Sequence, residues 1–378
     1  MKAHAKLSAS GSKRWMNCTP SVRLEESFTV QSSLFAEEGT VAHELAELMI
    51  SERLGMKTNA ELKPGYDRIE QSGFYSPDML QSVASYVDFV IERVHAAGPG
   101  AVVMLEQLLD YSEWVEGGFG TGDVIIINDQ AIEVIDLKFG KGLPVSAVLN
   151  PQLMLYGLGA IYTFGMLYEF ETVRMTIHQP RLDQVSTFEM QVDELLRWGD
   201  AKVKPKAQLA AAGEGEFAPG TWCQFCKAKA VCRARAEQNL ALAQYDFRAP
   251  DTLSDAEIGV VLKQGEQLGS WLSDLEKYVT GAILSGSVIE GYKVVEGRSN
   301  RKYSDERAVI SVLQEQGFSK EEVCKPMELL SITELEKRIT KNKFQQCIGH
   351  LIVKPQGKPT LVESSDPRVP FVAGSEFN

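Results

Sequence analysis

Long apolar runs are missing from this sequence. None of its 378 residues lies in a stretch long enough to span a membrane, and the opening MKAHAKLSASGSKRW lacks the apolar centre of a signal peptide. Net positive charge is missing too: the formal net charge is -12, so any contact with DNA requires a local basic surface or metal ions. The motif G-x-x-x-x-G-K-[ST] of ATP-driven motors does not occur. We therefore expect a cytoplasmic protein, not bound to membranes, whose six cysteines stay reduced unless they hold a metal.

What is present is the composition of a soluble globular protein, with 44% hydrophobic and 24% charged residues. Residues 1–38 are expected to be irregular. Helix and strand patterns then follow in the order helix 39–55, helix 76–98, strand 101–109, strand 123–129, strand 131–139, helix 150–165, strand 171–180 and helix 192–213. From residue 77 the order is α-β-β-β-α-β, which predicts the α/β class with a mixed sheet flanked by helices.

Three parts of the chain are expected. A composition shift near residue 245 separates a first domain, residues 1–240, from a mostly α-helical C-terminal domain, residues 250–352. Ser254 and Glu257 form a capping box that predicts the start of a long helix in that second domain. Residues 353–378 are rich in Pro, Gly and Ser, which predicts an extended tail.

Two carboxylates and an ammonium group stand within the apolar strand patterns, in GTGDVIII and EVIDLKF. Asp136 and Lys138 share one face of their strand because strand side chains alternate. Asp123 opens the preceding strand. Neighbouring carboxylates repel unless a divalent cation lies between them, and oxygen ligands of this kind suit Mg²⁺ or Mn²⁺. The pattern is typical of metal-assisted phosphodiester hydrolysis; the alternative is an ordinary ion pair between Asp136 and Lys138.

These motifs, followed by QLMLY and preceded by GTVAHELAE, resemble the PD-(D/E)XK nucleases. The resemblance is to the RecB-like exonuclease branch, which includes Cas4 and the AddB nuclease domain, and in detail to a phage-associated family. It covers roughly residues 10–240. It implies a restriction-endonuclease-like αβββαβ core, with the mostly helical C-terminal region as an addition.

The resemblance assigns roles residue by residue. It implies that Asp123, Asp136 and the backbone carbonyl of Leu137 ligate the catalytic metal, and that Lys138 acts on the attacking water. Gln152 and Tyr156 lie at i and i+4, so they share a helix face. The family places such residues against the active site or the DNA backbone, and plain helix packing is the alternative for both.

His43 stands in HELAE, which is not a zinc-protease H-E-x-x-H motif because Glu47 occupies the second histidine position. An isolated histidine among apolar neighbours such as Leu45 is more often structural. The RecB-like branch carries a metal-ligating histidine on a helix well before the first aspartate. The resemblance therefore implies that His43 is a metal ligand.

Cysteines at C-x2-C-x5-C spacing, in a reduced compartment, indicate a metal site. They are Cys223, Cys226 and Cys232, and Cys18 lies far upstream. A remote cysteine plus a C-terminal trio resembles the nucleases that carry a [4Fe-4S] cluster, and this implies that the four residues close the first domain as a ring. A Zn²⁺ site and unrelated free cysteines remain the alternatives.

The leading hypothesis is a Mg²⁺- or Mn²⁺-dependent deoxyribonuclease, in particular an exonuclease of a phage or prophage recombination module. Its expected partners are DNA and a phage single-strand annealing or single-stranded DNA-binding protein. Lysines and arginines around the cysteine trio could supply phosphate contacts or form a solvated helix face. The rival hypothesis is a catalytically inactive nuclease-like module that binds DNA or a protein partner. A zinc-stapled structural protein of a phage particle would leave the acidic pair unexplained.

Overall fold

The computed structural model describes residues 5–28, 34–128, 130–142, 144–241 and 253–292. Its helices and strands are α1 (Ser12–Asn17), α2 (Ser21–Glu25), α3 (Leu34–Arg53), α4 (Asn59–Glu70), α5 (Pro77–Ala97), β1 (Val102–Asp110), β2 (Phe119–Ile127), β3 (Ala131–Leu137), α6 (Pro151–Phe164), β4 (Thr172–Gln179), β5 (Gln184–Gln191), α7 (Val192–Trp198), α8 (Lys204–Ala212), α9 (Arg233–Leu240) and α10 (Asp255–Leu284). Short 3₁₀-helical turns lie at Pro180–Leu182 and Thr221–Phe225, and a π-helical turn lies at Gly199–Val203. The residues described cluster as one compact unit.

One five-stranded sheet, in the order β1-β2-β3-β4-β5, forms the centre of this unit. The β1–β2, β2–β3 and β4–β5 pairs are antiparallel, whereas β3 and β4 are parallel. Parallel neighbours need a long crossover connection, and α6 is the helix within it. The sheet is therefore mixed, and the predicted α/β class is confirmed.

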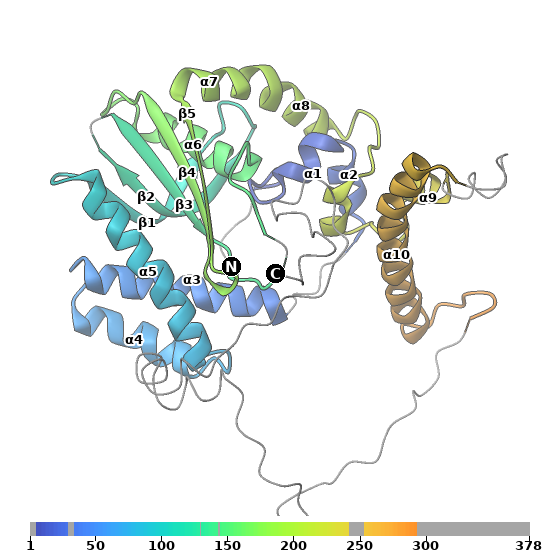
Figure 1. Ribbon diagram of the computed structural model, residues 1–378, viewed down its shortest axis with the longest axis horizontal. Coiled ribbons are helices and arrows are strands. Elements are labelled where there is room, and N and C mark those ends of the chain that lie inside the picture. Colours follow the sequence, from blue (N-terminus) through green and yellow to red (C-terminus); the bar gives the residue numbers. More distant parts are fainter. Residues whose placement is uncertain (1–4, 29–33, 129, 143, 242–252, 293–378) are drawn as a thin grey trace, which may run out of the picture. The chain divides into compact units, whose positions relative to one another are not determined.

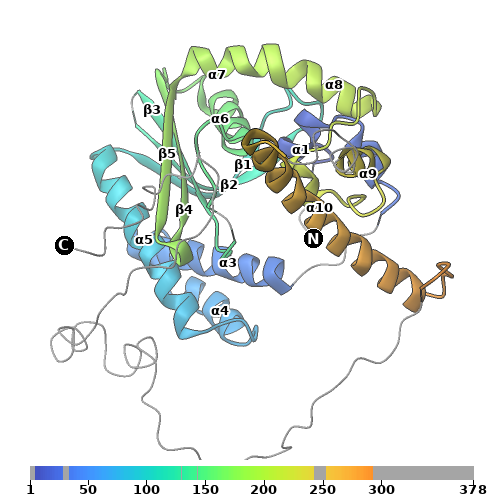
Figure 2. The same cartoon turned by 45° about the vertical axis from the view of Figure 1, so that its right-hand side comes forward.

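Helices cover both faces of the sheet (Figure 1). On one face, α6 and α7 pack with α8 and α1 around a core that includes Trp15, Leu155 and Leu195. On the other face, α3, α4 and α5 form a second core with Leu45 and Val87. Figure 2 shows these two groups of helices from another side. The apolar strands are buried because each face of the sheet has its own helical layer.

The structure contains elements that the expected list lacked, among them α1, α2, α4 and β5. Residues 12–17 and 21–25, expected to be irregular, form α1 and α2. The helix α4 follows α3 directly, and its start is fixed by a capping box of Thr58 and Glu61. The edge strand β5 was not predicted because QVSTFEMQ is mostly polar and only half-buried, which weakens the apolar alternation of a strand.

In the C-terminal part, the predicted capping box is confirmed: Ser254 and Glu257 cap the start of α10. This helix contacts the cysteine-rich segment, where the Trp271 indole donates a hydrogen bond to the Ala230 carbonyl over 3.0 Å. The expected domain boundary near residue 245 and all predicted elements beyond residue 292 lie outside the described residues. Of the helices described, none is both long enough and apolar enough to cross a membrane.

Candidate metal centre

A row of three carboxylates crosses the sheet from β1 to β3. The pairs Leu105–Val124 and Gln107–Gly122 flank Glu106 and Asp123, so these two residues stand opposite each other on β1 and β2. Val124 and Ile135 form the last pair of the β2–β3 ladder. The next residue on each strand, Asp123 on β2 and Asp136 on β3, therefore stands opposite the other. Side chains opposite each other on antiparallel strands lie close together. Three like charges in one row are unfavourable without a counter-charge.

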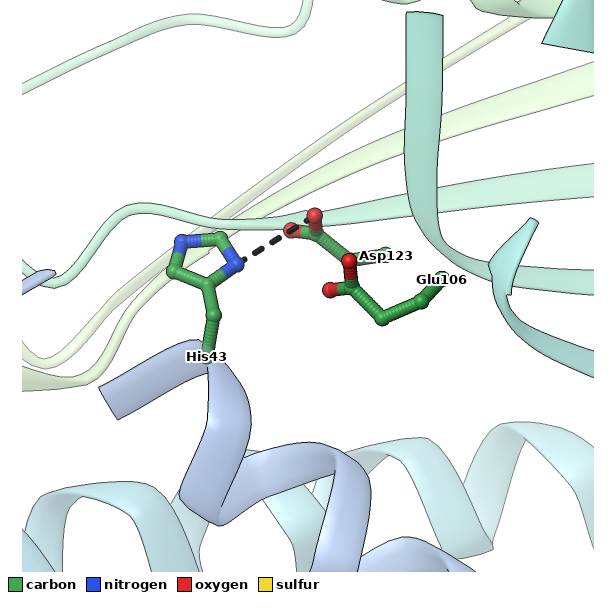
Figure 3. Close-up of side chains that lie close together, drawn as sticks. All are labelled: His43, Glu106 and Asp123. Atoms are coloured by element: carbon green, nitrogen blue, oxygen red, sulfur yellow. Dashed lines mark ion pairs between the residues drawn. The ribbon is translucent and has the colours of Figure 1, made fainter. Parts of the chain in front are cut away.

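His43 brings a nitrogen ligand to this row from α3. Its Nδ1 atom lies 3.3 Å from Asp123 Oδ1, as the dashed line in Figure 3 shows. One potential ligand atom each from His43, Glu106 and Asp123 lies within 4.8 Å of the other two. These side chains line a small cavity together with Leu137, whose backbone N–H donates to Asp123 Oδ2 over 2.7 Å. One nitrogen and two carboxylates in this arrangement fit a divalent cation.

Glu106 is a residue that the sequence reasoning did not assign as a metal ligand. Its φ is +47°, a left-handed backbone conformation that a non-glycine residue seldom adopts within a strand. Such conformations cost energy and concentrate at functional sites. The signal in the sequence is a single carboxylate inside the apolar strand VVMLEQLL, but strand pairing was needed to connect it to Asp123.

Burial and neighbouring charges set the protonation of this centre. Burial lowers the pKa of His43, but Asp123, Asp136 and Glu106 outweigh it and raise that pKa to about 9. Burial raises the pKa of Asp123, yet His43 and the Leu137 N–H hold it below its ordinary value. The pKa of Asp136 is raised by burial, lowered by its lysine neighbour and raised by Asp123, and the net shift is upward. At neutral pH, His43 therefore carries a proton that a cation binding at its nitrogen has to displace.

Lys138 and Gln152 contact Asp136, and Tyr156 lies next to Gln152. Lys138 Nζ lies 2.8 Å from Asp136 Oδ2 and donates to Gln152 Oε1 over 3.0 Å. Gln152 Nε2 donates to Asp136 Oδ1 over 3.0 Å and reaches the Tyr156 hydroxyl at 3.4 Å. Burial lowers the pKa of Lys138, but Asp136 outweighs it and the net shift is upward, so the ammonium stays charged.

Local structure around α6 fixes these contacts. The Asn150 side chain caps the helix by accepting from the Gln152 backbone N–H over 3.0 Å, and Pro151 occupies the first turn. A Cβ atom at Gly120 would lie 2.7 Å from the Tyr156 ring, so a glycine in β2 is what admits the tyrosine. The GTGD motif therefore supplies space as well as a carboxylate.

The four predicted cluster cysteines lie around one pocket. Cys18, Cys223, Cys226 and Cys232 line it together with Trp222 and other residues of both chain regions. Burial raises the pKa of Cys226 to about 12 and also raises the pKa of Cys223. Buried thiols hold their protons in this environment, and a bound metal would stabilise the thiolate forms.

Contacts beside the cysteines already join the two distant regions. Arg14 Nη1 donates to the Phe225 carbonyl over 3.1 Å, and the Lys227 N–H donates to Glu25 Oε1 over 2.8 Å. Arg14 also pairs with Glu25 at 2.8 Å. The predicted meeting of the chain around residue 18 with the chain around residue 226 is therefore a feature of the fold.

Two basic side chains near the cysteines are engaged within the protein. Lys229 and Arg235 pair with Asp274 of α10 at 2.8 and 2.9 Å. Arg235 is buried, so it supports α10 and is not a surface phosphate contact.

The fold and the acidic row define an α/β protein with a candidate divalent-cation centre. Residues 4–369 match the family described as "Protein of unknown function (DUF2800)", and the chain belongs to that family. The chain is also similar to a solved structure named "Crystal structure of SSO0001", at 18% identity over 59% of this chain and 96% of that chain. The TM-score of that comparison is 0.23, a value that supports no argument about fold or function.

Proposed function

We propose that this chain is a metal-dependent deoxyribonuclease. The observation that carries the proposal is the joining of Asp123, Asp136 and Lys138 in one buried site beside His43. A structural ion pair would need only one carboxylate and one ammonium group, whereas this site gathers a second carboxylate and an imidazole. Burying so much charge is costly unless it serves a bound cation or a reaction.

His43, Asp123 and Glu106 would hold the divalent cation, with Asp136 and the Leu137 carbonyl as the further ligands that the resemblance to PD-(D/E)XK nucleases implies. When bound, Mg²⁺ or Mn²⁺ polarises the scissile phosphate and makes water a better nucleophile. Lys138 stays protonated beside Asp136, so it donates hydrogen bonds that orient the attacking water and stabilise negative charge on the phosphate.

Gln152 and Tyr156 position this lysine. Gln152 bridges Lys138 and Asp136 with two hydrogen bonds of 3.0 Å each. Tyr156 packs next to Gln152 and is buried against Gly120, whose missing side chain leaves room for the tyrosine ring. The glutamine therefore holds the ammonium group and the carboxylate in a fixed relation, which is the kind of preorganisation that catalysis needs.

For the cysteine site we propose a structural [4Fe-4S] cluster held by Cys18, Cys223, Cys226 and Cys232. These four cysteines line one pocket. A tetrahedral zinc ion with Zn–S distances of about 2.3 Å would hold their sulfur atoms about 3.8 Å apart. The resemblance to nucleases with a remote cysteine and a C-terminal trio supports the cluster, and zinc remains the alternative that metal analysis decides.

The substrate we propose is DNA with a free end, processed in phage or prophage recombination together with an annealing or single-stranded DNA-binding protein. The test is incubation of end-labelled linear and circular DNA with Mg²⁺ or Mn²⁺. We expect cleavage by the parent protein, and none by Asp136→Asn or Lys138→Ala, while both variants keep the parent's circular dichroism spectrum. Asp88→Asn removes a carboxylate from an exposed ion pair on α5 and serves as the matched control.

The outcomes separate the proposal from its rival. Equal loss of cleavage in both site variants, with Asp88→Asn active, supports the nuclease. A parent protein that shifts DNA in gels but leaves it intact with either cation would instead support the inactive binding module.

A further inference from the structure

Tyr86 on α5 is a buried tyrosine whose hydroxyl has no hydrogen-bond partner among the described residues. Its side chain is only 1% exposed, and the hydroxyl oxygen is one of the buried polar atoms without a partner. A buried hydroxyl in this state destabilises a folded protein relative to phenylalanine. Retention of the oxygen at this position therefore calls for a ligand or a partner that it serves.

The cavity that Tyr86 lines is the one formed by His43, Glu106 and Asp123. It has room for an occupant about the size of one water molecule. The three side chains offer their ligand atoms within 4.8 Å of one another (Figure 3). Tyr86, with its unpaired hydroxyl, thus belongs to the lining of the candidate cation site, although it comes from a different helix and no motif marks it.

Packing holds the Tyr86 ring in this place. The ring stacks on His178 with centroids 5.6 Å apart and planes 28° apart, and Phe89 contacts the same histidine at 5.1 Å. His178 pairs with Leu137 in the parallel β3–β4 ladder. Phenylalanine can make the same ring stacking on His178, so the hydroxyl oxygen is what distinguishes tyrosine from phenylalanine at this position.

We propose that Tyr86 is a positioning residue of the cation centre, whose hydroxyl donates a hydrogen bond to the Glu106 carboxylate when Glu106 ligates a divalent cation. This inference rests on the cation centre of the proposed function and adds Tyr86 behind its Glu106 ligand. Glu106 stands opposite Asp123 and lines the same cavity as Tyr86, and both oxygens of Asp123 engage His43 and the Leu137 N–H, so the hydroxyl is assigned to the Glu106 carboxylate. Outer hydrogen bonds of this kind fix ligand orientation and strengthen metal binding.

Charge favours the hydroxyl in the donor role. Burial raises the pKa of Tyr86 well above its ordinary value, and the carboxylates of Asp123, Asp136 and Glu106 raise it further. The phenol therefore keeps its proton across the range in which the protein is studied, and a protonated phenol is the form that can donate to a carboxylate.

The test is calorimetric titration of Mn²⁺ into the full chain without DNA. For Tyr86→Phe we expect the dissociation constant to rise about tenfold or more, the usual effect of losing an outer hydrogen bond at a metal site. Glu106→Gln should raise it further. Tyr111→Phe is the matched control, because Tyr111 is also buried but its hydroxyl donates to the Phe119 carbonyl over 2.9 Å, in the other core of the protein.

Thermal melting separates a positioning role from a structural one. In EDTA, Tyr86→Phe should melt at or above the parent temperature, because the variant no longer buries an unpaired hydroxyl. With Mn²⁺ added, its rise in melting temperature should be smaller than that of the parent. An unchanged Mn²⁺ affinity in Tyr86→Phe, or a parent protein that binds no Mn²⁺, would overturn the inference.

Binding and cleavage are measured independently. If Mn²⁺ affinity depends on Tyr86 and Glu106 but the parent protein cuts no DNA, the inference holds and the proposed nuclease activity fails. If the parent cuts DNA while Tyr86→Phe binds Mn²⁺ like the parent, the nuclease holds and the inference fails.

Discussion

Binding of a divalent cation at pH 7 should release about one proton from His43. The imidazole Nδ1 lies 3.3 Å from Asp123 Oδ1, and the surrounding carboxylates raise its pKa to about 9 against the opposing effect of burial. At pH 7 such a group is about 99% protonated, whereas a histidine with an ordinary pKa of about 6.5 is about 24% protonated. Only the neutral imidazole can ligate a metal, so the cation has to displace the proton.

Calorimetry can count that proton. Mn²⁺ is titrated at pH 7 in two buffers of different ionisation enthalpy, and the dependence of the observed heat on that enthalpy gives the number of protons released. The parent protein should release about one proton more per bound ion than His43→Gln, titrated at higher Mn²⁺ concentration. A difference near a quarter of a proton, or none, would refute the pairing of His43 with Asp123 as the reason for the raised pKa.

The His43–Asp123 pair also predicts how the stability of the metal-free protein, measured in EDTA, changes with pH. A histidine whose folded-state pKa is raised contributes stability that is fully present below its unfolded pKa of about 6.5 and is lost as the pH rises through the folded value. With the folded pKa at about 9, the parent's melting temperature should fall between pH 7 and 9.5 relative to that of His43→Gln. A constant difference over this range would contradict the linkage.

Three further predictions concern other parts of the fold. Leu149, exposed and at a left-handed φ of +51°, should gain about 1 kcal/mol of unfolding free energy on Leu149→Asn, since Asn tolerates that conformation; urea unfolding checks this, and a loss would speak against strain. Cys18→Ser and Cys226→Ser should lose the same bound iron, about four atoms in the parent, and lower the melting temperature equally; unequal effects would mean that the two residues do not close one ring. The pKa of Asp274 is raised by burial but lowered more by Lys229 and Arg235, so its stabilising effect exists above its unfolded pKa of about 3.8 and disappears in acid. Asp274→Asn should therefore reduce the urea midpoint at pH 7 but match the parent near pH 3; an equal deficit at both values would exclude the ion pairs as the cause.

Local patterns in the sequence were sufficient for most of the core. The strands β1 to β4 and the helices α3, α5 and α6 follow from apolar runs, turn residues and caps, and all of them are present in the structure. The shared position of Asp136 and Lys138 follows from the period of a strand, and that of Gln152 and Tyr156 from the period of a helix. These relations hold within one element, so no tertiary information is needed.

Elements stabilised by their surroundings were harder to predict. The helices α1 and α2 are six and five residues long, too short to be stable alone, and they exist because they pack on α8 and the cysteine-rich segment. The edge strand β5 is polar and half-buried, and it pairs along the whole of β4. In both cases the decisive contacts come from residues distant in the chain.

The sequence by itself determined that two aspartates lie in apolar strands with a lysine close behind the second, and that four cysteines have the spacing of a metal site. Only the tertiary structure decided which groups face one another. Strand register placed Glu106 beside Asp123, and helix packing delivered His43 and Tyr86 to the same cavity. Register and packing are set by the fit of whole apolar faces, in which a one-residue slip would turn each side chain to the opposite face of the sheet. No local pattern records that fit, so the composition of the cavity could be known only from the folded chain.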